Sequence, residues 1–255
     1  MKKIADFTIV GKERWSRSAL FRLQSAEPLP HIDGGQFVQA RVDGNNNVYL
    51  RRPISIHDVD MDSNTIELLI QEAHEGTKTL CSLPIGAKVN IVLPLGNGFT
   101  MPEMSDEVLL VGGGVGVAPL LYFAKMIKET FPGKQVPFLL GGRSKDDLVL
   151  LDKYKEVGEV FVTTNDGSLG ENGFVTQHSL WESSSFDKIY SCGPLPMMKA
   201  VAAMAREKKI WCEVSLENSM ACGIGACLCC VENTADGNVC VCKEGPVFNI
   251  NRLLW

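Results

Sequence analysis

Cysteines concentrate near the C-terminal end of this 255-residue chain, where six of the nine lie between positions 222 and 242. Three of them, Cys222, Cys227 and Cys230, have the spacing C-x4-C-x2-C, which is typical of plant-type [2Fe-2S] sites. In a reducing compartment, such clustering indicates metal binding rather than disulfide bonds. We therefore predict an iron–sulfur cluster held by this segment.

The residues around these cysteines support the same chemistry. Gly223 and Gly225 allow the tight turns that direct backbone N–H groups toward sulfur. We expect Cys242 to be the fourth ligand, with Cys240 as the alternative, and the side chain of Cys229 to point away from the iron. A structural zinc site usually combines two C-x2-C pairs, and this segment has one, so the spacing favours iron and sulfur over zinc.

A second pattern is an apolar strand, expected over 108–111, that runs into a glycine-rich turn and then a helix expected over 118–130. Glycine lets the backbone approach an anion closely, and the helix N-terminus supplies N–H donors. The same pattern can also form a tight turn without a ligand. We predict that the phosphates of a dinucleotide bind at four turn glycines: Gly112, Gly113, Gly114 and Gly116. The departure from G-x-G-x-x-G at Ala118-Pro119 disfavours a standard Rossmann dehydrogenase.

Two later segments, one around Asp166 and one around Cys192, follow predicted strands of the same domain. Open α/β sheets bind ligands at such strand ends. If Asp166 contacts the ribose, its carboxylate accepts a hydrogen bond from a 2′-hydroxyl and repels a 2′-phosphate, which favours NAD over NADP. Arg143 argues weakly for the opposite preference. Cys192 precedes Gly193 and Pro194, a context that suggests a thiol beside the nicotinamide, although a lone cysteine is more often a small buried side chain.

A third pattern lies on an early strand, where Arg52 stands three residues before Ser55. A guanidinium offers a fixed fork for a pyrophosphate, and a hydroxyl on the same strand can hydrogen-bond the edge of a flavin. The alternative is that the arginines simply lie on a solvated face. Gly76 and Thr77 open a short helix expected over 77–82, whose N-terminus offers a second anion site.

The order of predicted elements gives an α+β multidomain protein. Short β-rich runs separated by turn residues predict an N-terminal antiparallel β-barrel over 1–98. Alternating strands and helices, with further helices expected over 148–154 and 195–208, predict a central α/β domain with a parallel sheet over 99–210. The segment 211–255 is rich in Cys and Gly and too small to have a hydrophobic core of its own, so we expect whatever its cysteines bind to organise it.

Composition excludes several classes of function. The chain has 45% hydrophobic and 22% charged residues, and 25 Lys and Arg stand against 30 Asp and Glu without blocks of charge. This argues against nucleic acid or an anionic membrane as the main partner. No apolar run approaches the roughly 20 residues of a membrane span, and no apolar signal core follows the N-terminal lysines, so we expect a cytoplasmic protein.

These motifs, in this order, resemble the ferredoxin reductase superfamily and, within it, the electron-transfer subunits of type B dihydroorotate dehydrogenase. The most specific segments are Met-Ala-Cys-Gly-Ile-Gly-Ala-Cys at 220–227 and Gly-Pro-Val-Phe at 245–248. The resemblance implies cluster ligation by the four cysteines at 222, 227, 230 and 242. It also implies that FAD is bound by Arg52, Pro53, Ile54, Ser55, Leu69, Ile70, Gln71, Gly76 and Thr77. The extra cysteine at 229 and the short loop from 230 to 242 depart from the family pattern and leave the fourth ligand slightly open.

The resemblance further implies a relay in pyrimidine biosynthesis. Dihydroorotate is oxidised at FMN in a separate catalytic subunit, electrons pass singly through [2Fe-2S] to FAD, and FAD delivers a hydride to NAD+. A flavin suits this place because it accepts electrons one at a time and releases two together. The family implies a heterotetramer of two chains of each kind and no catalytic side chain on this one. We also expect an exposed apolar surface around the C-terminal segment, including Phe248 and Trp255, to dock the catalytic subunit.

Two alternatives remain from the sequence. One is an NAD(P)H-dependent ferredoxin or sulfide reductase subunit with the same three modules; such relatives often carry Asp at the first cluster position, where this chain has Cys222. The other is a structural nucleotide-binding module with a zinc knuckle and no flavin.

Overall fold

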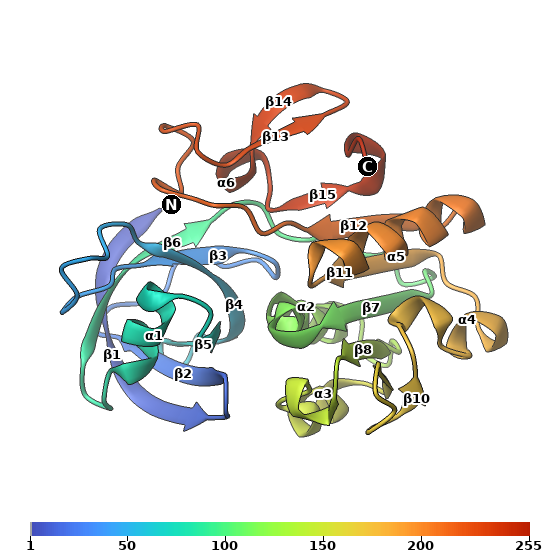
Figure 1. Ribbon diagram of the computed structural model, residues 1–255, viewed down its shortest axis with the longest axis horizontal. Coiled ribbons are helices and arrows are strands. Elements are labelled where there is room, and N and C mark those ends of the chain that lie inside the picture. The colour runs from blue at the N-terminus through green and yellow to red at the C-terminus, as the bar shows by residue number, and fades with distance from the viewer. Residues whose placement is uncertain (1) are drawn as a thin grey trace.

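A closed antiparallel barrel forms the N-terminal part of the computed structural model, which describes residues 2–255 (Figure 1). Neighbouring strands follow the order β1-β2-β5-β4-β3-β6 around the barrel. The strands and the one helix of this part are β1 (Lys3–Arg14), β2 (Ser18–Ser25), β3 (Phe37–Ala40), β4 (Arg52–Asp60), β5 (Thr65–Gln71), α1 (Glu75–Ser82) and β6 (Lys88–Leu95). Apolar side chains such as Phe7, Phe21 and Ile66 fill its interior, which confirms the predicted barrel.

A seven-stranded sheet forms the second part, in the order β10-β9-β8-β7-β11-β12-β15. Neighbouring strands are parallel except for the last, which runs antiparallel to β12. Its strands are β7 (Val108–Gly113), β8 (Phe138–Gly142), β9 (Val160–Thr164), β10 (Glu171–Asn172), β11 (Lys188–Cys192), β12 (Trp211–Ser215) and β15 (Val247–Asn249). The alternation of strands and helices therefore gives the predicted parallel arrangement.

Helices cover both faces of this sheet. The helices α2 (Ala118–Thr130) and α3 (Leu151–Val157) pack on the face toward the barrel, while α4 (Leu180–Ser183) and α5 (Leu195–Lys208) pack on the other. The bounds of α2 and α5 are those expected from the sequence. Within residues 2–255, no helix is long and apolar enough to cross a membrane.

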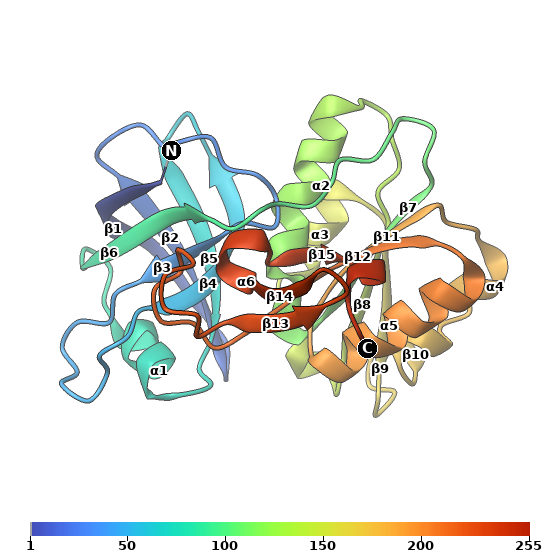
Figure 2. The same cartoon turned by 90° about the horizontal axis from the view of Figure 1, so that it is seen from above.

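The cysteine-rich segment lies across the other two parts, above both the barrel and the sheet (Figure 2). It contains the hairpin β13 (Val231–Thr234) and β14 (Gly237–Cys240) and the short helix α6 (Val241–Glu244), while β12 and β15 join the central sheet. Its buried side chains share one hydrophobic core with Phe37 and Leu95 of the barrel. The segment is therefore held by packing on its neighbours as well as by whatever its cysteines bind.

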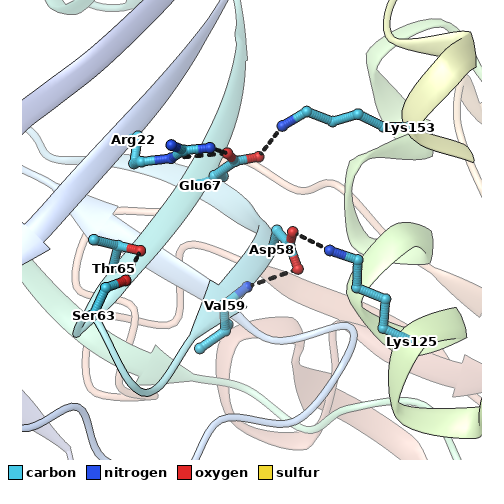
Figure 3. A network of polar contacts seen from close by, with 8 residues as sticks. All are labelled: Arg22, Asp58, Val59, Ser63, Thr65, Glu67, Lys125 and Lys153. Atoms are coloured by element: carbon cyan, nitrogen blue, oxygen red, sulfur yellow. Dashed lines mark hydrogen bonds and ion pairs between the residues drawn. The ribbon is translucent and has the colours of Figure 1, made fainter. Parts of the chain in front are cut away.

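Ion pairs connect the barrel to the helices of the second part (Figure 3). The carboxylate of Glu67, on β5, lies 2.8 Å from Nη2 of Arg22 and 2.7 Å from Nζ of Lys153 on α3. Lys125, on α2, pairs with Asp58 on β4. These two ion pairs help to hold the barrel against the helices α2 and α3. They thereby contribute to the spacing between a ligand bound to the barrel and one bound to the sheet.

We expect Glu67→Gln to lower the free energy of unfolding by about 2 kcal/mol at pH 7, because two charge-assisted hydrogen bonds weaken. Burial alone would raise the pKa of Glu67, but its bonds to Lys153 and Arg22 lower it below the ordinary value. The stabilisation is thus complete above the unfolded value of about 4.3 and is lost as the pH falls through the folded pKa. Urea unfolding of the wild type and of Glu67→Gln, at pH 7 and at lower pH, tests this. A difference in unfolding free energy between them that does not shrink in acid would contradict it.

Candidate functional site

The cysteine loop directs backbone N–H groups at sulfur, as the two glycines led us to expect. Gly223 and Gly225 have positive φ angles of 72° and 86°. With these turns, the N–H groups of Ile224 and Ala226 donate to Sγ of Cys222 at 3.4 and 3.3 Å. Burial raises the pKa of the Cys222 thiol, but these and neighbouring hydrogen bonds outweigh it and lower the value to about 6. The loop thus favours a thiolate, the form that binds metal.

The four cysteines predicted as ligands come together around the loop over 222–230. The N–H of Cys242 donates to Sγ of Cys230 at 3.4 Å, and the N–H of Gly225, between Cys222 and Cys227, donates to Sγ of Cys242. Across residues 2–255, no three His, Cys, Asp or Glu side chains converge on one point as they would around a single ion. Four cysteines gathered without such a point suit a cluster with two irons, each with two protein ligands, better than a mononuclear zinc site.

Cys242 and Cys240 differ in their surroundings. Cys242 is fully buried, and its Sγ accepts a hydrogen bond from the N–H of Gly225 at 3.1 Å. Cys240 is half-buried at the end of β14, and Cys229 is exposed. The geometry therefore favours Cys242 over Cys240 as the fourth sulfur of the group.

The loop packs directly on the barrel. A Cβ at Gly223 would lie 2.7 Å from Cγ of Gln39, on β3, and 3.1 Å from Cδ1 of Leu95, on β6. This close approach explains why position 223 has no side chain. It also brings the cysteine loop against the barrel strands that neighbour the predicted flavin strip.

The predicted flavin strip lies on β4, half-buried along its length from Arg52 to Ser55. The guanidinium of Arg52 donates to the backbone carbonyls of Leu50 and Arg51 at 2.9 and 3.3 Å. A Cβ at Gly76, in the first turn of α1, would lie 2.3 Å from Nε of Arg52. Arg52 and the N-terminus of α1 are thus side by side, which suits a pyrophosphate held by a guanidinium and helix N–H groups.

The remaining predicted flavin contacts surround this strip. Pro53 and Ser55 pair with Gln39 and Phe37 on the neighbouring strand β3. Leu69 and Ile70 are buried, and Gln71 is exposed; Ile54 is half-buried on the strip itself. The hydroxyl of Thr77 accepts from the N–H groups of Ala73 and His74, so its side chain caps α1 and only its backbone remains available to an anion.

A cavity of about 850 Å³ opens between the barrel and the sheet. Arg17 and Gln71 reach it from the barrel, and the glycine turn and the ends of β8, β9 and β11 supply the opposite wall. Gly113, Gly114 and Gly116 all line it. Thr163 lines the cavity as well, and its Oγ1 is buried without a hydrogen-bond partner. The volume, and a largely apolar lining with a few polar groups such as Thr163, fit a dinucleotide bound at the carboxyl ends of the strands.

The glycines of the turn are needed for close packing. A Cβ at Gly116 would lie 2.4 Å from Cα of Gly193, which follows β11. A Cβ at Gly113 would meet Sδ of Met197 at 2.6 Å, and one at Gly112 would meet Cγ1 of Val117 at 2.6 Å. The turn and the start of α5 therefore approach each other backbone to backbone at the cavity wall.

Three residues predicted to contact the nucleotide do not line the cavity: Gly112, Asp166 and Cys192. Asp166 is exposed, and its carboxylate accepts from both the N–H and the hydroxyl of Ser168 at 3.0 and 2.6 Å. Its neighbour Asn165 lines the cavity instead. Cys192 is fully buried at the end of β11, and burial raises the pKa of its thiol well above the ordinary range. Gly193, not Cys192, contributes to the wall.

Sequence reasoning missed a carboxyl group in the cavity. Glu217, two residues beyond β12, lines the wall together with Gly193. Glu217 is exposed at the cavity wall, and partial desolvation by the surrounding residues raises the pKa of its carboxyl. The only sequence signal is an acidic residue just after a strand end, which is too common to single out.

Comparisons with known proteins agree with this geometry. Residues 217–254 match the model for the iron–sulfur cluster binding domain of dihydroorotate dehydrogenase B, and residues 110–203 match the oxidoreductase NAD-binding domain. The dihydroorotate dehydrogenase B (NAD(+)) electron transfer subunit of Shouchella clausii is 38% identical over 260 residues, covering 99% of each chain. The chain belongs to this family. The subunit of the same name from Fusobacterium nucleatum is 40% identical over 84% of each chain.

Among solved structures, a chain of the NADH-dependent reduced ferredoxin–NADP oxidoreductase is similar over nearly the full length. It superposes with a TM-score of 0.87 at 31% identity, covering 98% of this chain and 90% of that one. Membership of the dihydroorotate dehydrogenase B electron-transfer family confirms the resemblance seen in the sequence and the class of oxidoreductase component. It also confirms that the cysteine-rich segment is an iron–sulfur segment and that the central part is an NAD-binding domain.

Proposed function

We propose that this chain is the electron-transfer subunit of a dihydroorotate dehydrogenase of type B, and that it passes electrons from the oxidation of dihydroorotate to NAD+. The observation that carries the proposal is the order of the three sites in space. The cysteine loop packs on the barrel at Gln39, and the flavin strip lies on the next strand, β4. The dinucleotide cavity opens between the barrel and the sheet. A one-electron site, a flavin site and a two-electron site thus follow one another.

The residues fit each group. Cys222, Cys227, Cys230 and Cys242 would hold the [2Fe-2S] cluster, supported by the backbone N–H groups that donate to the sulfurs of Cys222, Cys230 and Cys242. When bound, the cluster carries single electrons and FAD converts them into a hydride for NAD+.

For the flavin, the Arg52 fork and the first turn of α1, with its glycine at 76, would hold the pyrophosphate, and Ser55 would orient the ring edge. For NAD+, the turn glycines would bind phosphate, and Glu217 would stand in the cavity wall. We retain Asp166 as a candidate for ribose recognition at the cavity rim.

We further propose that the partner is an FMN-containing catalytic subunit, in a heterotetramer of two chains of each kind. Within the cysteine loop, Ile224 and Leu228 expose 49% and 65% of their surface, so apolar area surrounds the cluster site. Phe248 is 1% exposed, so our expectation from the sequence that it contacts the partner is wrong. We place the reaction in the cytoplasm, where a reducing environment keeps the cysteines as thiols.

Replacing Leu228 by Asp should weaken the complex with the catalytic subunit by about tenfold, which corresponds to about 1.4 kcal/mol. Ile85→Asp is the matched control, because Ile85 is 62% exposed on the barrel loop between α1 and β6, outside the cysteine loop. Titration of the catalytic subunit by calorimetry measures both. Equal affinities of the Leu228→Asp and Ile85→Asp variants for the catalytic subunit would show that the cysteine loop is not part of the interface.

The proposed function is tested by mixing the chain with an FMN-containing dihydroorotate dehydrogenase subunit and following NADH formation from dihydroorotate and NAD+. We expect turnover that requires both chains. A second candidate, reduction of NAD(P) by ferredoxin, is favoured by the similarity to the ferredoxin–NADP oxidoreductase chain. Turnover with reduced ferredoxin but not with the dihydroorotate-oxidising subunit would establish that candidate instead.

A further inference from the structure

A buried amide lies between the cysteine loop and the flavin strip. The side chain of Gln39 is fully buried, yet neither its Oε1 nor its Nε2 has a hydrogen-bond partner within residues 2–255. Its main chain is engaged normally, since the carbonyl of Gln39 accepts from Nη1 of Arg51 at 3.2 Å. Buried polar groups in native proteins nearly always have partners, so this amide is placed for a group that the protein chain itself does not supply.

The position of this amide identifies the group. A Cβ at Gly223 would lie 2.7 Å from Cγ of Gln39 and 3.2 Å from its Nε2, so the amide lies directly beneath the loop residue that follows Cys222. On the neighbouring strand β4, Pro53 of the flavin strip is the register partner of Gln39. The amide therefore touches the cysteine loop, on a strand directly beside the flavin strip.

A nearby glutamine shows what a structural amide looks like in this barrel. Gln36 donates from its Nε2 to the carbonyl of Gly96 at 2.8 Å and accepts through Oε1 from the N–H of Asp33 at 2.8 Å. Both of its polar atoms are satisfied by the backbone. The contrast indicates that the role of Gln39 is not to bind its own chain.

We infer that Gln39 is a positioning residue for the iron–sulfur cluster, whose amide N–H donates a hydrogen bond to a sulfur of the cluster or of its cysteine ligands. This rests on the proposed function, since it requires the cluster at the cysteine loop. A donor to sulfur stabilises the reduced cluster, which carries more negative charge, and so raises its reduction potential. Gln39 would thereby set the driving force for electron transfer between the cluster and the flavin beside it.

The test is an EPR-monitored redox titration of the loaded protein, comparing wild type with Gln39→Leu, which removes the donor. We expect the reduction equilibrium of the cluster to shift about tenfold toward the oxidised form, equivalent to about 59 mV for one electron. Gln39→His, which keeps an N–H donor, should restore most of the potential. Gln36→Leu is the matched control and should lower stability without moving the cluster potential.

Three results would overturn the inference. A cluster potential unchanged in Gln39→Leu would show that the amide does not contact sulfur. A shift of the flavin potential alone would assign the amide to the flavin. A shift in Gln39→Leu that Gln39→His does not reduce would mean that packing, not the donor, is responsible. If Gln39→Leu does not retain its cluster, Gln39→Met, of similar length and also without a donor, carries the same prediction. A wild-type protein without a [2Fe-2S] signal would instead contradict the proposed function itself.

Discussion

Serine in place of Cys242 should abolish the [2Fe-2S] signal and reduce NADH formation from dihydroorotate by at least about 100-fold. The reason is geometric: Cys242 is buried, its N–H donates to Sγ of Cys230, and its own Sγ accepts the N–H of Gly225, so its sulfur lies with those of the cysteine loop. NADH oxidation with an artificial acceptor should persist, because the flavin and dinucleotide sites lie on other elements. Iron and flavin content, EPR and both activities are the measurements.

Cys240→Ser is the matched control for this substitution. Cys240 stands two residues away at the end of β14 and is half-buried, so its loss should leave the cluster spectrum and both activities intact. If Cys240→Ser lost the cluster and Cys242→Ser kept it, the ligand set would be wrong at its fourth member. If both kept it, neither would be a ligand.

Alanine in place of Gly116 should lower kcat/KM for NAD+ by about 100-fold while leaving the flavin and the cluster bound. Its Cβ would lie 2.4 Å from Cα of Gly193, a backbone atom, so the glycine turn and the start of α5 would have to separate. A displacement of that size in a site that positions a nicotinamide is enough to cost about two orders of magnitude. Steady-state kinetics with NAD+ and direct titration of NADH into the oxidised protein measure the effect.

Gly133→Asn provides the control for Gly116→Ala. Gly133 follows α2 with a φ angle of 89°, a conformation that Asn tolerates best among other residues, and nothing lies within 4 Å of a Cβ there. It does not line the cavity. Similar losses for both substitutions would show that general destabilisation, rather than the cavity wall, explains the effect. An unchanged kcat/KM for NAD+ in Gly116→Ala would show that the glycine turn is not part of the binding site.

Sequence reasoning predicted most of the fold because its signals are local. The alternation of β-rich runs and turns marked the barrel, and the helices over 118–130 and 195–208 were found with their observed bounds. The helix expected over 148–154 instead begins at Leu151, because Leu150 adopts a left-handed conformation that interrupts it. Such a backbone turn depends on tertiary packing and leaves no pattern in the sequence.

The same distinction between local sequence signals and tertiary packing applies to the functional sites. The C-x4-C-x2-C spacing and the glycines within it indicate chemistry by themselves, since they determine where sulfurs and N–H groups can point. Gln39 and Glu217 could not be found from the sequence, because each is an ordinary residue whose role arises from neighbours more than 100 residues away: Gly223 for Gln39 and Gly113 for Glu217. Asp166 could be located at a strand end, but its bond to Ser168 could not be foreseen.

The central claim is that one chain holds a [2Fe-2S] cluster, a flavin and an NAD site in electronic contact. An anaerobic visible and EPR spectrum of the isolated protein, before and after addition of NADH, tests it most directly. We predict that NADH bleaches the flavin and produces the EPR signal of a reduced [2Fe-2S] cluster. A colourless protein that contains zinc, binds no flavin and remains EPR-silent with NADH would contradict the account.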